Sequence, residues 1–238
     1  MFITALIPAR YGAIRFPGKL MQSLGGRSVI RRTYEAARDT DLFQEVIVAT
    51  DSDEIENEIL SVGGNVFRSK QPHESGTDRI AEATEDLTTD LIINIQGDTP
   101  FIKKEPLEKL IALFQDPTVS VASMMQVLEK NEEIDDPNFV KVAIDRKSNA
   151  LFFSRSRIPF PRDPDQSATY YEHIGVYAFR KRALLDFISW PMGELESVEK
   201  VECLRFLENG VPIRMLAVDY IGVEIDTPDD LKKAEKLL

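Results

Sequence analysis

Short apolar runs alternate with amphipathic stretches through the first half of the chain. FITALIP, EVIVAT and NVFRS, at residues 2–8, 45–50 and 65–69, each have the length and composition of a buried strand. Stretches with apolar residues at helical spacing separate these runs. Because parallel strands need long crossover connections, which are usually helices, this order predicts a parallel sheet covered by helices.

The expected helices have recognisable ends. Ser28 is suited to cap a helix after the first strand, and a second helix should begin at residues 51–53. Ile55, Ile59 and Leu60 would give the second helix an apolar stripe, and the glycines that follow would end it. Both helices should therefore pack one face against the sheet.

A further helix, expected at residues 79–87, leads into the strand-like sequence LIINIQGD at residues 91–98. The apolar part of this strand ends abruptly at Gln96, Gly97 and Asp98. Ligands of open α/β sheets bind outside the carboxyl ends of the strands. The sequence therefore predicts a ligand site at this end of the sheet.

The middle of the chain has a different pattern. VKVAID, ALFFSR and HIGVYAF resemble strands joined by polar turns, which predicts a mostly antiparallel insertion over approximately residues 131–200. SVEKVECLRFLENG, at residues 197–210, predicts one helix before a last strand at 213–219; its expected apolar side consists of Val198, Val201, Leu204 and Leu207. We predict a single α/β domain over residues 1–238, with a mixed, mainly parallel sheet flanked by helices.

The chain is acidic, with a formal net charge of -11 and a pI of about 4.8. This balance argues against a nucleic-acid partner bound by a general basic field. A single cysteine, Cys203, is typical of a protein made for a reducing compartment. The apolar run at the N-terminus is too short for a membrane span and resembles no targeting signal, so we expect a cytoplasmic protein that acts on small molecules.

The loop after the first strand, in IPARYGAIRFPGK, concentrates three cations: Arg10, Arg15 and Lys19. Two guanidiniums and an ammonium suit several anionic oxygens, such as those of a triphosphate, although solvated surface cations are the alternative. The loop is no P-loop, because five residues separate Gly12 from Gly18 and no Ser or Thr follows the lysine. No dinucleotide-binding fingerprint follows this strand either.

The same stretch resembles the signature of the CMP-sugar synthetases, most closely of the 3-deoxy-manno-octulosonate (KDO) cytidylyltransferases. Similar motifs follow in order along the whole chain: HESGTDR, NIQGDTP, DDPNFVKVAID, LFFSRSRIPF, HIGVYAFRKR, LRFLENG and IDTPDDL. The resemblance implies a nucleotidyltransferase-type fold whose insertion forms a homodimer. It also implies Mg²⁺ dependence and transfer of CMP from CTP to the anomeric hydroxyl of KDO, for lipopolysaccharide biosynthesis.

The resemblance also implies roles for individual residues. The CTP triphosphate would be bound by Arg10, Arg15 and Lys19, and cytidine by Ser75, Gly76, Arg79 and Gln96. Mg²⁺ would be bound by Asp98 and Asp226, and the sugar acid by Arg155, His173, Tyr177 and Glu202. With Arg10, Arg15 and Lys19, the two aspartates form the expected catalytic set.

Taken alone, the residues leave structural alternatives open. Asp98 could form a turn, Asp226 could cap a helix, and the segment 75–77 could be a capped loop. His173 and Tyr177 are four residues apart, so a strand would place them on one face, where they could also be a half-buried packing pair. Arg157 could share or replace the role of Arg155, and Glu202 could simply belong to the solvated face of an acidic helix.

Some positions depart from the family pattern. Cys203 follows Glu202 where the family commonly has Gln, which leaves open 8-amino-KDO or another ulosonic acid as the sugar. Thr99 stands where an acidic residue is typical, so a third metal-binding carboxylate is not expected. A catalytically silent nucleotide-binding protein and a UTP-type nucleotidyltransferase are the remaining alternatives.

Overall fold

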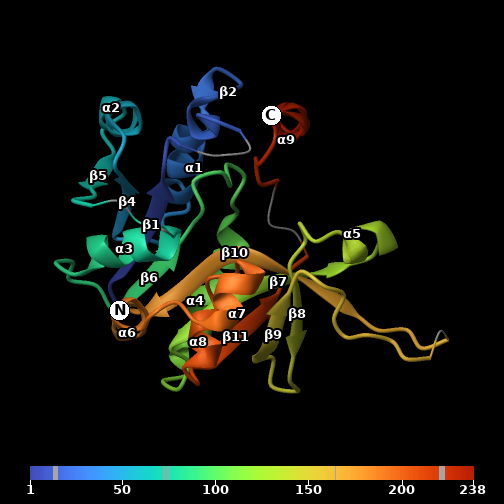
Figure 1. The fold of residues 1–238 in the computed structure, drawn as a ribbon. Coiled ribbons are helices and arrows are strands. Elements are labelled where there is room, and N and C mark those ends of the chain that lie inside the picture. The colour runs from blue at the N-terminus through green and yellow to red at the C-terminus, as the bar shows by residue number, and fades with distance from the viewer. Residues whose placement is uncertain (13–15, 72, 74, 164, 220–222) are drawn as a thin grey trace. The chain divides into compact units, whose positions relative to one another are not determined.

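A computed structural model describes residues 1–12, 16–71, 73, 75–163, 165–219 and 223–238 (Figure 1). The chain forms two compact units. The first comprises Met1–Glu108, Arg180–Leu185 and Ile221–Leu238, and the second comprises Lys109–Phe179 and Asp186–Tyr220. The organisation as one domain stays a prediction. None of the helices described is long and apolar enough to cross a membrane.

The first unit contains four parallel strands in the order β6–β1–β4–β5 (Figure 1). Their bounds are Leu91–Asn94, Ile3–Ala9, Glu45–Thr50 and Asn65–Arg68. All seven residues of β1 are buried, because β1 lies between two strands and is covered on both faces. The predicted parallel sheet is confirmed, and its strands all end at the same edge.

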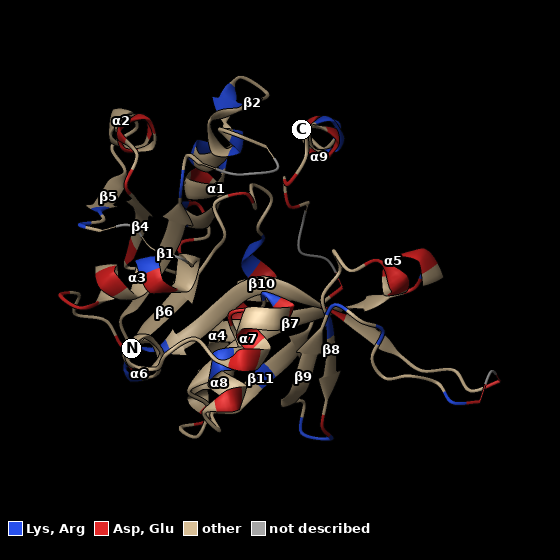
Figure 2. Cartoon of the chain, in the orientation of Figure 1, with Lys and Arg blue, Asp and Glu red and all other residues tan. Residues whose placement is uncertain are grey.

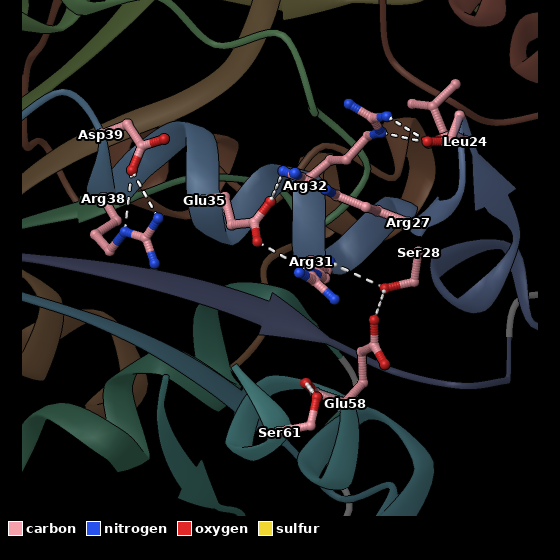
Figure 3. A network of polar contacts seen from close by, with 11 residues as sticks. Leu24, Arg27, Ser28, Arg31, Arg32, Glu35, Arg38, Asp39, Glu58 and Ser61 are labelled. Atoms are coloured by element: carbon pink, nitrogen blue, oxygen red, sulfur yellow. Dashed lines mark hydrogen bonds and ion pairs between the residues drawn. The ribbon is translucent and has the colours of Figure 1, made fainter. Parts of the chain in front are cut away.

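Helices α1 (Val29–Arg38), α2 (Asp53–Ser61) and α3 (Gly76–Thr84) connect these strands. Ser28 caps α1 as predicted, and its hydroxyl also donates to Glu58 of α2 at 2.7 Å (Figure 3). Leu60 is 52% exposed, so its predicted place on the buried stripe of α2 is wrong; Ile55 and Ile59 fill that stripe. In Figure 2 charged residues colour helices such as α2 and α3 and the hairpin at β2 (Ser23–Leu24), whereas β1 is tan.

The first unit also contains a short hairpin, β2 (Ser23–Leu24) and β3 (Arg27–Ser28), the 3-10 helix η1 (Lys19–Met21) and the C-terminal helix α9 (Pro228–Glu235). The guanidinium of Arg32 donates to main-chain carbonyls of this hairpin, at Leu24 and Gly25 (Figure 3). Helices α4 (Lys104–Ala112) and α6 (Lys181–Ser189) each include residues of both units.

The second unit has the strand order β11–β7–β10, with bounds Ile213–Ala217, Val121–Leu128 and Tyr170–Arg180. β7 pairs in parallel with β11 and antiparallel with β10, and the hairpin of β8 (Lys141–Ile144) and β9 (Ala150–Ser154) continues from β10. The predicted mixed sheet with a mostly antiparallel middle section is confirmed. Its short helices are η2 (Leu113–Gln115), α5 (Asn131–Asp135), α7 (Glu194–Glu199) and α8 (Leu204–Glu208).

The single helix predicted over residues 197–210 is wrong, because α7 and α8 are separate. Lys200 ends α7 with φ +55°, a left-handed conformation that interrupts a helix. Val198 is 74% exposed instead of buried. Glu196 and Arg205 also face inward and form a buried ion pair with two contacts of 2.7 Å. Val201 and Leu204 are buried as predicted, so the polar pair lies among part of the expected apolar side.

Candidate functional site

Three residues that are distant in sequence meet in the first unit. The ammonium of Lys19 lies 2.5 Å from an oxygen of Asp98 and 2.8 Å from an oxygen of Asp226. Lys19 begins η1, Asp98 follows β6, and Asp226 precedes Thr227, the N-cap of α9. The fold therefore brings together the cationic loop after β1 and the two predicted metal-binding aspartates.

Main-chain contacts hold these segments in place. The amide of Ile225 donates to the carbonyl of Asp98 at 3.0 Å, so the residues before α9 lie against the end of β6. Thr227 caps α9 in a capping box with Asp230. The capping function that Asp226 could have had therefore belongs to its neighbour, and the carboxylate of Asp226 is directed at Lys19.

One ammonium faces two carboxylates in this cluster, so it offsets one of their two charges. Lys19 and Asp98 are largely buried, with side-chain exposures of 16% and 18%, and Asp226 is 36% exposed. Burial acts to lower the pKa of Lys19, but the attraction and hydrogen bonds of the two carboxylates raise it above its usual value. Lys19 is thus firmly protonated and bridges the two aspartates.

The donor set fits a magnesium ion. Both carboxylates reach one nitrogen atom, so they can also approach one cation, and Mg²⁺ is typically bound by one or two carboxylates plus phosphate oxygens and water. Within the described ranges, no group of three or more His, Cys, Asp or Glu residues is arranged to hold a metal ion. Asp98 and Asp226 would accordingly supply the protein's part of the coordination.

A cavity of about 440 Å³ opens at the carboxyl ends of β1, β4 and β5, and the described residues that line it do not include Lys19, Asp98 or Asp226. Arg10 and Arg79, both predicted to contact the nucleotide, line it together with Asp51 and His73. Arg10 is exposed and directly follows β1. Arg15 lies outside the described residues. The wall carries both charges, since Asp53, Glu54 and Arg68 also line it, and Arg79 and Arg68 are paired with Asp51 and Asp53.

Arg79 is buried and has structural partners. Its guanidinium donates to Asp51 at 2.9 Å and to the hydroxyl of Ser69 at 3.1 Å. Burial acts to raise the pKa of Asp51, but the hydrogen bond and charge of Arg79 hold it below its usual value. Sequence reasoning assigned Asp51 only to a helix start, although its position directly after a buried strand is a signal for the ligand edge.

Gly76 and Gln96 lie together beside the end of β1. A Cβ atom on Gly76 would lie 3.2 Å from the Cγ of Pro8 and 3.9 Å from the Oε1 of Gln96. Ser75 is the N-cap of α3, and its hydroxyl accepts from the amide of Asp78 at 3.0 Å. The capped-loop interpretation of this segment is therefore correct for Ser75, while Gly76 permits a close approach of chain segments that a side chain would obstruct. Sequence reasoning did not identify Pro8.

The four residues predicted to bind the sugar acid belong to the second unit. His173 and Tyr177 lie side by side, with ring centroids 5.3 Å apart, so the prediction that they share a face is confirmed. Burial lowers the pKa of His173 to about 3. The hydroxyl of Ser123 donates to a main-chain carbonyl and lies 3.2 Å from the Nε2 of His173. With a pKa this low, His173 is too weak a base to accept the substrate's proton at neutral pH.

Arg155 follows β9, and its guanidinium is held by main-chain oxygens. It donates to the carbonyls of Glu199 at 2.7 Å, Pro137 at 2.8 Å and Lys200 at 3.4 Å. These acceptors carry no charge, so they orient the guanidinium without cancelling its positive charge. Glu202 lies in the turn between α7 and α8, not on the helix that the sequence suggested.

Cys203 is a buried thiol beside Tyr177. A hydrogen bond joins the two side chains, and burial raises the pKa of Cys203, so the thiol is uncharged at neutral pH. The residue that departs from the family pattern therefore contacts a residue predicted to bind the sugar.

Known proteins match this chain over most or all of its length. A family described as Cytidylyltransferase matches residues 4–215. The 3-deoxy-manno-octulosonate cytidylyltransferase of Flavobacterium johnsoniae is 52% identical, and the match covers 100% of this chain and 99% of the relative. The enzyme of the same name from Christiangramia forsetii is also 52% identical, over 99% of this chain and 96% of the relative.

Solved structures give the same result. A CMP:2-keto-3-deoxy-manno-octonic acid synthetase complexed with CTP is 36% identical, has a TM-score of 0.94 and covers 100% of this chain and 98% of its own. A 4-diphosphocytidyl-2C-methyl-D-erythritol synthase from Anaerococcus prevotii matches at 17% identity with a TM-score of 0.68, over 99% of this chain and 97% of its own. At this identity the second similarity concerns the fold alone.

Proposed function

The chain belongs to the 3-deoxy-manno-octulosonate cytidylyltransferase family, and on this premise we propose that it transfers CMP from CTP to the anomeric hydroxyl of KDO. The products would be CMP-KDO, an activated sugar for lipopolysaccharide biosynthesis, and pyrophosphate. The observation that carries the proposal is the meeting of Lys19, Asp98 and Asp226 at the carboxyl edge of the sheet. Cationic and carboxylate groups at one point suit a metal-bound triphosphate.

In the proposed reaction, the anomeric oxygen forms a bond to the α-phosphorus of CTP. The bond from that phosphorus to the bridging oxygen breaks, and pyrophosphate leaves with the electron pair, while the hydroxyl proton passes to water. Arg10, Arg15 and Lys19 would stabilise the charge of the leaving pyrophosphate. A Mg²⁺ ion held by Asp98 and Asp226 would supply Lewis acidity at the phosphate.

The nucleotide would be recognised by the first unit. Gly76 and Gln96 lie together at the end of β1, where the amide of Gln96 can face the polar edge of cytosine. Ser75 and Arg79 shape the same region by capping α3 and by fixing Asp51. Their contribution to cytidine binding would therefore come mainly from holding the wall of the pocket.

The sugar acid would be recognised by the second unit. Arg155 has neutral oxygen partners, so its charge is available for the carboxylate of the sugar. His173, Tyr177 and Glu202 would contact the sugar hydroxyls. Cys203, which departs from the family pattern, is hydrogen-bonded to Tyr177, a residue predicted to bind the sugar. For this reason 8-amino-KDO or another ulosonic acid remains the alternative substrate.

We also propose Mg²⁺ dependence, a homodimer and a cytoplasmic location. The two carboxylates that meet at the Lys19 ammonium support Mg²⁺ dependence, and the resemblance to the family supports a homodimer. Val127, Leu151 and Phe160 are exposed apolar side chains of the second unit, at 53%, 62% and 80%, and offer apolar surface for a partner. Light scattering on the purified protein would measure the oligomeric state.

The decisive experiment measures pyrophosphate release with a panel of nucleotides and sugar acids, in Mg²⁺ or in EDTA. We expect release with CTP and KDO, and its loss in EDTA. Release with 8-amino-KDO but not KDO would favour the other sugar. Nucleotide binding without release on any pair would show a catalytically silent protein, and release with UTP would show a different nucleotide specificity.

A further inference from the structure

A lysine lies fully buried in the second unit, at the start of β8. The ammonium of Lys141 donates to three main-chain carbonyls: those of Phe139 and Arg155 at 2.6 Å each and that of Asp136 at 2.9 Å. An ammonium has three protons, so these bonds use its whole donor capacity. Burial lowers the pKa of Lys141, and the carboxylates of Asp136 and Asp135 oppose this effect only in part.

Lys141 and Arg155 hold the same loop. The loop between α5 and β8 gives its carbonyls at residues 136 and 139 to Lys141, and the carbonyl of Pro137 to the guanidinium of Arg155. Lys141 in addition binds the main-chain oxygen of Arg155 itself. The ammonium therefore fixes both the main chain that carries the guanidinium and the loop that orients its tip.

The other side of Arg155 contacts the turn that leads to Glu202. Its Nε and Nη2 donate to the carbonyls of Glu199 and Lys200, and its amide donates to the carboxylate of Glu199 at 2.8 Å. A guanidinium held at both ends by fixed carbonyls has little freedom to change its rotamer. Its direction consequently depends on the loop that Lys141 holds.

We propose that Lys141 is a positioning residue for sugar-acid recognition, which acts by fixing Arg155 and the 136–139 loop. This inference rests on the proposed function, in which Arg155 binds the carboxylate of the sugar. Lys141 itself is fully buried and makes no contact with substrate. It determines the affinity for the sugar acid and leaves nucleotide binding unaffected.

The test compares Lys141→Met with Lys181→Met. Lys181 also donates to main-chain carbonyls, those of Glu85 and Leu87, but in the first unit. We expect Lys141→Met to raise the KM for the sugar acid by about tenfold to a hundredfold, because a displacement of about 1 Å suffices for such a loss. CTP affinity, measured by calorimetry, should stay within about twofold. Lys181→Met should leave both values unchanged.

Arg155→Ala and the double variant separate this inference from the proposed function. If Lys141 acts through Arg155, adding Lys141→Met to Arg155→Ala should raise the KM for the sugar acid no further. A folded Lys141→Met with a normal KM, while Arg155→Ala raises it, would overturn the positioning role alone. A normal KM in Arg155→Ala would overturn both. Where Lys141→Met does not fold, Lys141→Gln, which retains two N–H donors, gives the same readout.

Discussion

The protein should lose stability between pH 7 and pH 5 because of one residue. His173 has a pKa of about 3 in the folded chain, since its ring is buried against Phe153 and Tyr177, whereas a histidine in the unfolded chain titrates near 6.5. Between these two values the unfolded chain binds a proton that the folded chain does not. The free energy of unfolding therefore rises with pH from 3 to 6.5 and falls on acidification.

The size of this effect follows from the two pKa values. At pH 5 an unfolded histidine with pKa 6.5 is almost fully protonated, while folded His173 is almost fully neutral. Compared with pH 7, the linkage favours unfolding by a factor of about 25, which is about 2 kcal/mol. This stability difference hardly depends on the pKa of His173 in the folded chain, because any folded pKa below about 4 leaves the ring neutral at pH 5.

Urea unfolding at pH 7 and pH 5, followed through the fluorescence of the single tryptophan, Trp190, measures this difference. In His173→Gln the pH-dependent loss should be smaller than in the wild type by about 2 kcal/mol. His73→Gln is the matched control, because His73 is the only other histidine; the loss should persist there. An NMR titration midpoint near 6.5 for His173, or equal pH dependence in His173→Gln and the wild type, would refute the reasoning.

Two further substitutions test the site and the core. Asp98→Asn should lower pyrophosphate release by about a hundredfold or more without unfolding the chain. Asp145→Asn, in a surface turn, is the control and should leave pyrophosphate release unchanged. Near-normal release by Asp98→Asn under limiting Mg²⁺ would contradict the metal assignment. Glu196→Gln should lower the free energy of unfolding by about 3–5 kcal/mol, since it leaves Arg205 buried without its counter-charge. The exposed pair of Glu133 offers the control: Glu133→Gln should cost less than about 1 kcal/mol, and equal losses in the two variants would disprove the burial argument.

Much of the first unit could be predicted from sequence because its signals are local. A strand such as residues 45–50 is a continuous apolar run, and a cap such as Ser28 acts on its own helix. The meeting of Lys19 with Asp98 could be expected as well, because parallel strands bring their carboxyl ends to one edge. The position of Asp226 was implied by the family resemblance, since helix capping explained that residue equally well.

The second unit was harder because its determinants are long-range. The pair of Glu196 and Arg205 spans nine residues and two helices, and no helical periodicity signals such a partner. Lys141 was overlooked for the same reason: its three carbonyl partners come from a loop and from the end of another strand. A charged residue inside the apolar run VKVAI was the available signal.

The bridge that Lys19 forms between Asp98 and Asp226 means that the polypeptide supplies its own counter-ion. The ammonium offsets the mutual repulsion of the two carboxylates without a bound metal ion. The three segments can therefore fold together in the presence of a chelator. A divalent ion that took over the acids would set the ammonium free beside the place where the negative charge of the nucleotide collects. Replacement of the Lys19 ammonium by a divalent ion at the two carboxylates would then couple metal binding to phosphate binding.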